Sequence, residues 1–267
     1  MKILLLGVTH PTIKLLNKKL SKNNSVKYLH YRKLDIDIPE AKIKERFNLV
    51  ISLCPIWEVK NILVNKFIKF SKIIVISSTS IFSKLDSLSF KDRTLSKNYL
   101  MGEKEIIKLC EKNKSIYTIC RTTMLWGFNY DKNISKIINL AKKFHFLPYP
   151  YPSSGLRAPI HFETLTDFLY KIALNNNQDS SEIIILSGRN VYKLNQIFKI
   201  IAKKYKGILI PVFVPTNILL KIYKIFKFEF FNSIAGFSER SSNDLDFHEV
   251  DHYKTIFVEQ INLKEMI

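Results

Sequence analysis

The chain has 267 residues, of which 46% are hydrophobic, and it carries a formal net charge of +19. A chain of this size and composition can bury a large core, which excludes a disordered or fibrous protein. The basic residues are mostly lysines scattered along the whole length, so the charge argues against a nucleic-acid-binding protein and leaves a general preference for anionic ligands.

Short apolar runs alternate with helical patterns from the N-terminus onward. Strands are predicted at 2–7, 26–31, 49–54, 72–78, 117–122 and 183–188. Helices are predicted at 11–22, 39–46, 57–69, 94–113, 133–144, 164–174, 193–205 and 216–231. The alternation predicts an α/β fold with a doubly wound parallel sheet, covered by helices on both faces, and a smaller lobe towards the C-terminus.

The N-terminal apolar run is too short for a signal-peptide core and far too short to span a bilayer. The cysteines have apolar neighbours and no metal-ligand spacing, which predicts buried, reduced thiols in a cytoplasmic protein. They are Cys54, Cys110 and Cys120.

One helical stripe of the 216–231 segment carries Lys221, Lys224 and Lys227. A helix of this kind can lie weakly on a membrane surface. It can also pack on the domain with its lysines in water, which is the interpretation that we favour.

The turn after the first strand reads "GVTHPTI". A dinucleotide fingerprint has glycines at every third position because they let the backbone approach the pyrophosphate. Only Gly7 fits that pattern, and His10 and Ile13 stand where the later glycines would fall. Thr9 and Thr12 could still offer hydroxyl groups or cap the next helix. The motif is weak, and a plain strand-to-helix turn explains it equally well.

Polar residues also follow the second and fourth strands. In "HYRK", Arg32 stands near the place of the acidic residue that binds the ribose of NAD, and it would suit the 2'-phosphate of NADP instead. A solvated basic loop is an equal alternative. The fourth strand ends in "ISSTSIF", whose hydroxyl groups could orient a substrate oxygen or cap a turn.

In their order and spacing these segments resemble the NAD-dependent epimerase/dehydratase family, extended or atypical short-chain dehydrogenases/reductases that act on nucleotide sugars. The resemblance covers about residues 1–260 and is carried by "KILLLGVTH", "IIVISSTSIF", "GEKEIIKLCEKNKSIYTICRTTMLWG" and "GLRAPIHFETLTDFLYKIAL". It implies a Rossmann-like NAD(P)-binding domain at 1–190, with substrate-lobe insertions from about 128. It also implies a small C-terminal substrate lobe at 191–267.

The resemblance implies roles for single residues. Ser78 would hydrogen-bond the reacting oxygen. The residues implied in cofactor binding lie at strand ends and are Gly7, Thr9, His10, Pro11, Thr12, Cys54, Pro55, Ser77 and Thr122. Those implied in substrate binding are Thr79, Asn133 and Arg157. The cofactor would be NAD or NADP, and Arg32 slightly favours NADP.

The family's Tyr-x-x-x-Lys pair is displaced in "SKNYLMGEK". Tyr99 and Lys104 are five residues apart, which turns the lysine about 100° away from the tyrosine's helical face. Alignment on Glu103, a family position four residues after the lysine, puts Tyr99 on the lysine's place and Leu95 on the tyrosine's place. We therefore expect that the usual pair is lost, with Tyr99 as the remaining catalytic candidate and Lys97 as a substitute cation.

The leading hypothesis is an NAD(P)-binding, nucleotide-sugar epimerase/dehydratase-like protein that transfers hydride at a sugar carbon if it is active. The alternative is a non-catalytic module that binds NAD(P) or a nucleotide in the same cleft, or that holds an anionic partner such as RNA. The resemblance also implies a homodimer as one assembly. His248 and His252 have helical metal-ligand spacing, but their segment is typical of a polar surface, and no metal site is predicted.

Overall fold

The computed structural model describes residues 1–29, 45–175, 180–213, 221–223, 225, 229–243, 253–258 and 263. The strands of its central sheet all run parallel, in the order β13-β10-β5-β4-β3-β1-β2. They are β1 (Lys2–Leu6), β2 (Ser25–Leu29), β3 (Arg46–Ser52), β4 (Lys69–Ser78), β5 (Ile116–Thr122), β10 (Glu182–Gly188) and β13 (Lys254–Val258). The predicted doubly wound α/β fold is confirmed.

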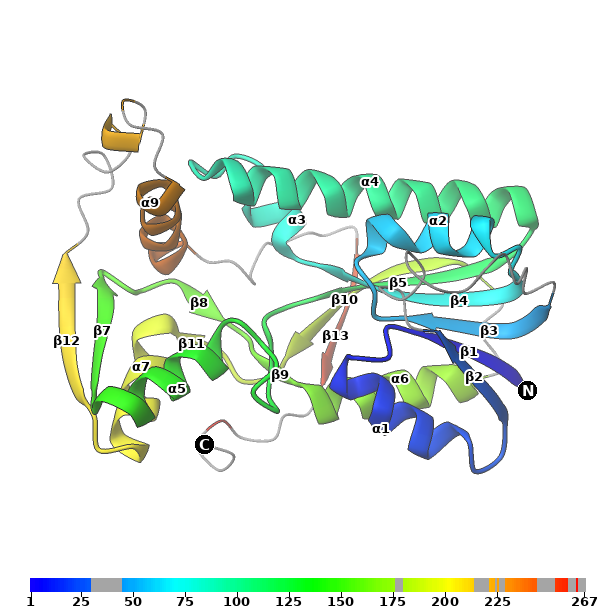
Figure 1. The fold of residues 1–267 in the computed structure, drawn as a ribbon, viewed down its shortest axis with the longest axis horizontal. Helices are drawn as coiled ribbons and strands as arrows, with labels where there is room; N and C mark the ends of the chain where they lie inside the picture. The colour runs from blue at the N-terminus through cyan, green and yellow to red at the C-terminus, as the bar shows by residue number, and fades with distance from the viewer. Residues whose placement is uncertain are drawn as a thin grey trace.

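Alternate residues of each strand point into two different cores, because side chains of a strand alternate between its faces. On β1, Ile3 and Leu5 belong to one core and Leu4 and Leu6 to the other. Helices α1 (Pro11–Leu20) and α6 (Phe162–Leu174) cover the first face, and α2 (Ile56–Asn65) and α4 (Phe90–Asn113) cover the second (Figure 1). The apolar runs of the sequence are therefore buried on both sides.

Strand β1 is the point at which the order of the sheet reverses. Its neighbours are β2 on one side and β3 on the other, so the chain leaves it in opposite directions. In open parallel sheets, such a switch point leaves a crevice beyond the carboxyl ends of the strands. The turn that begins at Gly7 lies at this place.

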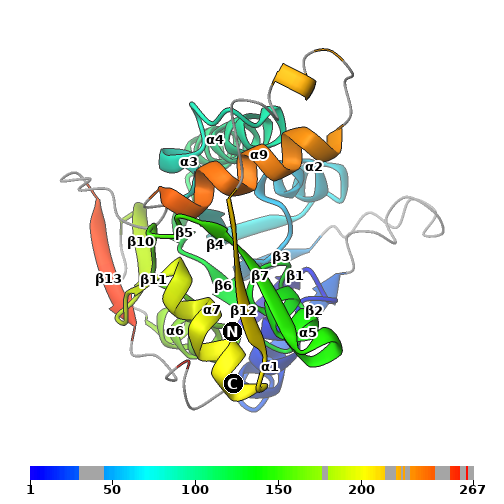
Figure 2. The ribbon, with the colours of Figure 1, turned by 90° about the vertical axis from the view of Figure 1, so that its left-hand side faces the viewer.

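A smaller lobe stands at the carboxyl end of the sheet (Figures 1 and 2). Its elements are α5 (Ile134–Phe144), β7 (Phe146–Tyr151), α7 (Leu194–Lys204), β12 (Ile208–Phe213) and α9 (Glu229–Ser242). Short strands and one short helix join the two parts: α3 (Ser80–Ser83), β6 (Leu125–Trp126), β8 (Leu156–Arg157), β9 (Ile160–His161) and β11 (Tyr192–Lys193). A third core, around Leu147, Ile197 and Phe198, belongs to this lobe.

Several predicted boundaries differ from the observed ones. The predicted helix at 39–46 lies largely outside the described residues, and β3 already begins at Arg46. Within the predicted helix at 216–231, the described residues 221–223 and 225 are helical, whereas α9 at 229–242 overlaps that prediction only at its first residues, and β13 was not predicted. Because β13 pairs with β10, the segment 191–267 contributes to the central sheet as well as to the lobe, and the division at 190/191 stays a prediction.

Other expectations concern single residues. All three cysteines are unpaired and at most 4% exposed, as predicted. Within the part of the chain that the structure describes, no helix is both long and apolar enough to cross a membrane. Lys224 and Lys227 of the basic stripe lie outside the described residues.

Candidate functional site

A cavity of about 790 Å³ lies beyond the carboxyl ends of β4 and β5, between the sheet and the lobe. It brings together residues that are far apart in the sequence. Of the predicted site residues, those that line it are Ser77, Ser78, Thr79, Tyr99, Thr122, Asn133 and Arg157. A volume of this size suits a small organic ligand.

The lining of the cavity is rich in basic side chains. Its basic lining residues are Lys84, Lys132, Lys136, Arg157 and Arg240. Among the described residues that line it, there is no aspartate or glutamate. An excess of positive charge in a concave site with protein walls favours anionic ligands.

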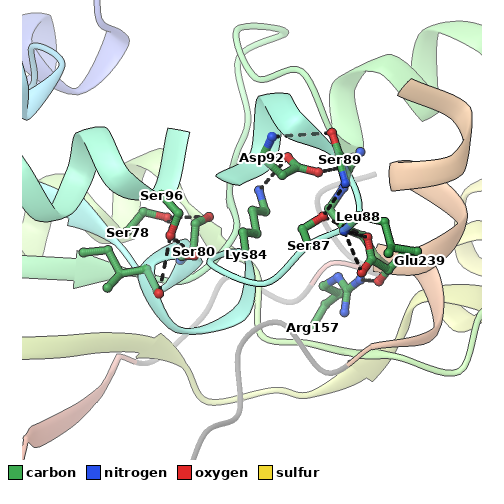
Figure 3. A network of polar contacts seen from close by, with 12 residues as sticks. Ser78, Ser80, Lys84, Ser87, Leu88, Ser89, Asp92, Ser96, Arg157 and Glu239 are labelled. Carbon is green, nitrogen blue, oxygen red and sulfur yellow. Dashed lines mark hydrogen bonds and ion pairs between the residues drawn. The ribbon is translucent and has the colours of Figure 1, made fainter. Parts of the chain in front are cut away.

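The hydroxyl groups at the end of β4 are engaged with the protein. Ser77 Oγ donates to Glu103 Oε1 at 2.5 Å, and Thr79 Oγ1 donates to the Thr122 carbonyl at 3.3 Å. Ser78 Oγ donates to Ser80 Oγ at 2.9 Å and accepts the Ser80 N–H at 3.1 Å (Figure 3). Ser78 and Ser80 are only partly buried and both line the cavity, so theirs are the hydroxyl groups with room for a ligand oxygen.

A buried ion pair fixes α4 against β5 behind these serines. Arg121 Nε and Nη2 donate to the two oxygens of Glu103 at 3.0 and 2.7 Å, and the exposed fractions of the residues are 4% and 3%. The Arg121 guanidinium also lies over the rings of Phe82 and Tyr253. This two-point contact sets the rotation of α4 and thereby the face that it presents to the cavity.

The rotation of α4 decides where the side chains of Tyr99 and Lys104 lie. Tyr99 faces the cavity wall, and its ring packs edge-on against Trp57 at 5.3 Å. Burial raises the pKa of Tyr99. Lys104 and Lys97 are exposed and line no part of the cavity, so neither stands where it could lower that pKa. Tyr99 as an acid or base stays a prediction, and neither Lys97 nor Lys104 supports it.

The C-terminal end of α9 closes one side of the cavity. Arg157, only 2% exposed, donates to the carbonyls of Leu156, Asn243 and Arg240, which places its positive charge at the end of that helix. Arg240 in turn pairs with Asp92. Lys84 approaches the same carboxylate at 3.8 Å (Figure 3). The guanidinium of Arg157 is therefore used to attach α9, and its predicted contact with a diphosphate stays a prediction.

The opposite wall begins at α5. Asp131 caps this helix by accepting the N–H groups of Asn133 and Ser135, at 2.9 and 3.1 Å. The Asn133 side chain makes no capping bond and is exposed at the cavity. Lys132 and Lys136, both exposed, flank it. Asp131 therefore caps the helix, and the Asn133 side chain is left for a ligand.

The turn after β1 lies against the residues that follow β3, and this region is separate from the cavity. Gly7, with φ +101°, lies so close to the next strand that a Cβ would stand 3.2 Å from the Leu53 carbonyl carbon and 3.3 Å from the Cys54 nitrogen. Pro55 precedes α2 as its N-cap. The predicted cofactor residues of these segments line no part of the cavity described above.

The residues of the first turn do not fit the pyrophosphate of a dinucleotide. Such a ligand needs free N–H groups at the start of the helix. Here Pro11 has none, the Thr12 N–H is donated to His10 Nδ1 at 3.3 Å, and the Ile13 N–H is donated to the His10 carbonyl at 3.0 Å. The Thr12 hydroxyl group, fully buried, donates to the Phe162 carbonyl at 3.4 Å.

His10 should make stability depend on pH. Burial lowers its pKa from 6.5 to about 4. The unfolded chain then binds more protons between these two values, so stability falls as the pH falls through them. Between about pH 7 and about pH 5 the His10 contribution should fall by about 2 kcal/mol. His10→Asn keeps a capping acceptor but does not titrate in this range. Between about pH 7 and about pH 5, its free energy of unfolding in urea should therefore fall by about 2 kcal/mol less than that of the natural protein. An equal fall in both proteins would contradict the assignment to His10.

Some predicted positions cannot be placed. Arg32, on which the NADP preference depends, lies outside the described residues, as do His248 and His252. Sequence reasoning missed Lys84, Lys132, Lys136 and Arg240. The signal for Lys132 and Lys136 was their spacing of four beside Asn133. Lys84, at the end of α3, and Arg240, on α9, both contact Asp92 of α4, and the sequence does not reveal these contacts.

No family model matches the sequence, and no curated protein matches it. Solved structures do match. A variant of the UDP-glucuronic acid 4-epimerase from Bacillus cereus has a TM-score of 0.66 at 15% identity, covering 80% of this chain and 86% of that one. A dTDP-4-dehydrorhamnose reductase ortholog from Clostridium acetobutylicum has a TM-score of 0.59 at 18% identity, covering 80% and 84%.

A third match is the dTDP-glucose 4,6-dehydratase from Bacillus anthracis, with a TM-score of 0.59 at 14% identity, covering 80% of this chain and 85% of that one. The UDP-glucuronic acid 4-epimerase and the dehydratase were each solved in complex with NAD. The expected resemblance is thus confirmed at the level of architecture: this chain has the Rossmann-like fold of the NAD-dependent epimerase/dehydratase family.

Proposed function

We propose that this protein binds a nucleoside-diphosphate sugar in the cavity between the sheet and the lobe. The observation that carries the proposal is the charge of that cavity, which has basic residues and no acidic residue among its described lining. A diphosphate supplies the matching negative charge, and the sugar supplies hydroxyl groups for side chains such as Asn133 and Ser78.

The fold supports the same ligand class. Solved structures with this fold include complexes with UDP-glucuronic acid and UDP-glucose. In this chain Lys132 and Lys136 are exposed at the cavity, whereas Arg157 is engaged with backbone carbonyls. We therefore assign the diphosphate to the two lysines, with the sugar directed towards the end of β4.

Hydride transfer at a sugar carbon is a second candidate. The partly buried hydroxyl of Ser78 at the cavity favours it, because that group could hold a reacting oxygen. The fold supports a cofactor of the NAD type, whereas the first turn does not fit one. The choice of NADP through Arg32, the acid-base role of Tyr99, the homodimer and the RNA-binding alternative all stay predictions.

Calorimetric titration with UDP-glucose and UDP-glucuronic acid tests the proposal. We expect saturable binding of at least one of them with a dissociation constant of roughly 1–100 µM. Uridine, which lacks the diphosphate, is the matched control and should bind at least about tenfold more weakly. Equal affinity for uridine, or no binding of any nucleotide sugar, would sink the proposal.

A further inference from the structure

The β1–α1 turn is filled by the chain's own side chains. The His10 imidazole packs edge-on against the rings of Tyr130 and Phe162, with centroids 5.0 and 4.8 Å away. Phe128 stacks on Phe162 and contacts His161, which extends the aromatic cluster. Rings from α6 and from the loop after β6 therefore flank the partly buried side chain that replaces a fingerprint glycine.

Contacts within the loop after β6 hold Tyr130 against His10. Gly127 has φ +123°, and a Cβ on it would stand 2.3 Å from His161 Nε2. The Gly127 N–H is donated to the Asp131 carboxylate at 3.1 Å. The loop is thus attached at both of its ends, and Tyr130 is held between them over His10.

Four of the backbone N–H groups around the turn are also donated within the chain. The N–H groups of Gly7, His10, Thr12 and Ile13 are all donated to acceptors of this chain. The imidazole offers no positive charge at neutral pH, because burial keeps it neutral. A phosphate entering here would have to displace the ring and break the bond that caps α1.

From these contacts we propose that His10 closes the β1–α1 turn to dinucleotide phosphates, so that the protein takes its nucleotide ligand in the cavity without NAD(P) at the turn. The assignment concerns the turn alone and does not depend on which ligand the cavity binds. It identifies His10 as the residue that blocks dinucleotide phosphates at the turn.

The test is a titration of the protein with NADH and NADPH, followed by nicotinamide fluorescence. We expect no saturable binding by the natural protein at about millimolar concentration, and binding at least about tenfold tighter by His10→Gly. His145→Gly is the matched control: His145 caps α5 in a left-handed conformation that glycine adopts easily, far along the chain from the turn. It should bind as the natural protein does.

Saturable micromolar binding of NADH or NADPH by the natural protein would overturn the proposal. Binding that is equally weak in His10→Gly would overturn the assignment to His10, provided that circular dichroism shows the variant folded. Titration of the same preparations with UDP-glucose separates the two proposals, because the nucleotide sugar should bind equally to the natural protein and to His10→Gly. A failure of UDP-glucose alone would count against the cavity ligand and leave the closed turn standing.

Discussion

Replacing Glu103 with alanine is expected to lower the free energy of unfolding by about 3–5 kcal/mol. The substitution removes the carboxylate that holds Arg121 with two hydrogen bonds and accepts the Ser77 hydroxyl group. It leaves a guanidinium that is only 4% exposed without its counter-charge. Urea unfolding at neutral pH, followed by circular dichroism, measures the loss.

The matched control is Asp167→Ala, which breaks the pair with Lys19 on the surface. The side chains of that pair are 56% and 45% exposed, so its loss should cost less than about 1 kcal/mol. The double variant with Glu103→Leu and Arg121→Leu removes both buried charges and should recover part of the loss. A single Glu103→Ala variant as stable as the control would show that the buried pair does not fix α4.

Reversing two charges at the cavity, Lys132→Glu with Lys136→Glu, is expected to weaken the binding of UDP-glucose by about 100-fold. Both lysines are exposed at the cavity, and neither has a hydrogen bond that the fold requires among the described residues. Their replacement should therefore leave the fold intact while repelling the diphosphate. Calorimetric titration at low and moderate salt measures the change, which should shrink as salt screens the charges.

A second pair of exposed lysines controls for net charge. Lys108 and Lys112 lie four residues apart on α4, outside the cavity, and Lys108→Glu with Lys112→Glu changes the total charge by the same amount. This variant should bind UDP-glucose within about twofold of the natural protein. Equal weakening in both variants would show that bulk charge, rather than the cavity, attracts the ligand.

The fold could be predicted from the sequence because its strands are continuous apolar runs. Runs such as 3–6 and 73–76 have no polar residue on either face, which only a sheet covered on both sides can accommodate. The candidate site followed from the same rule: Ser78 and Thr122 end neighbouring parallel strands, and the structure brings them to one cavity. The spacing of five residues between Tyr99 and Lys104 predicted that the two side chains lie on different faces of the helix. Lys104 is exposed to solvent, which agrees with that prediction.

The partners of the polar groups could not be predicted, because they depend on contacts distant in the sequence. Arg157 was expected to face a diphosphate, but its donors meet carbonyls of Arg240 and Asn243, which the chain brings there through α9. Thr12 was expected at the cofactor, and its hydroxyl group meets Phe162 instead. The role of His10 as a cap flanked by aromatic rings likewise depends on where α6 packs.

The most direct test of the account is a crystal structure of the protein grown or soaked with UDP-glucose. We predict that the ligand lies in the cavity, with its diphosphate within about 4 Å of the Lys132 or Lys136 ammonium group and its sugar towards Ser78. The His10 ring should keep its place between Tyr130 and Phe162. A nucleotide bound instead at the β1–α1 turn, with the His10 ring displaced, would contradict the account.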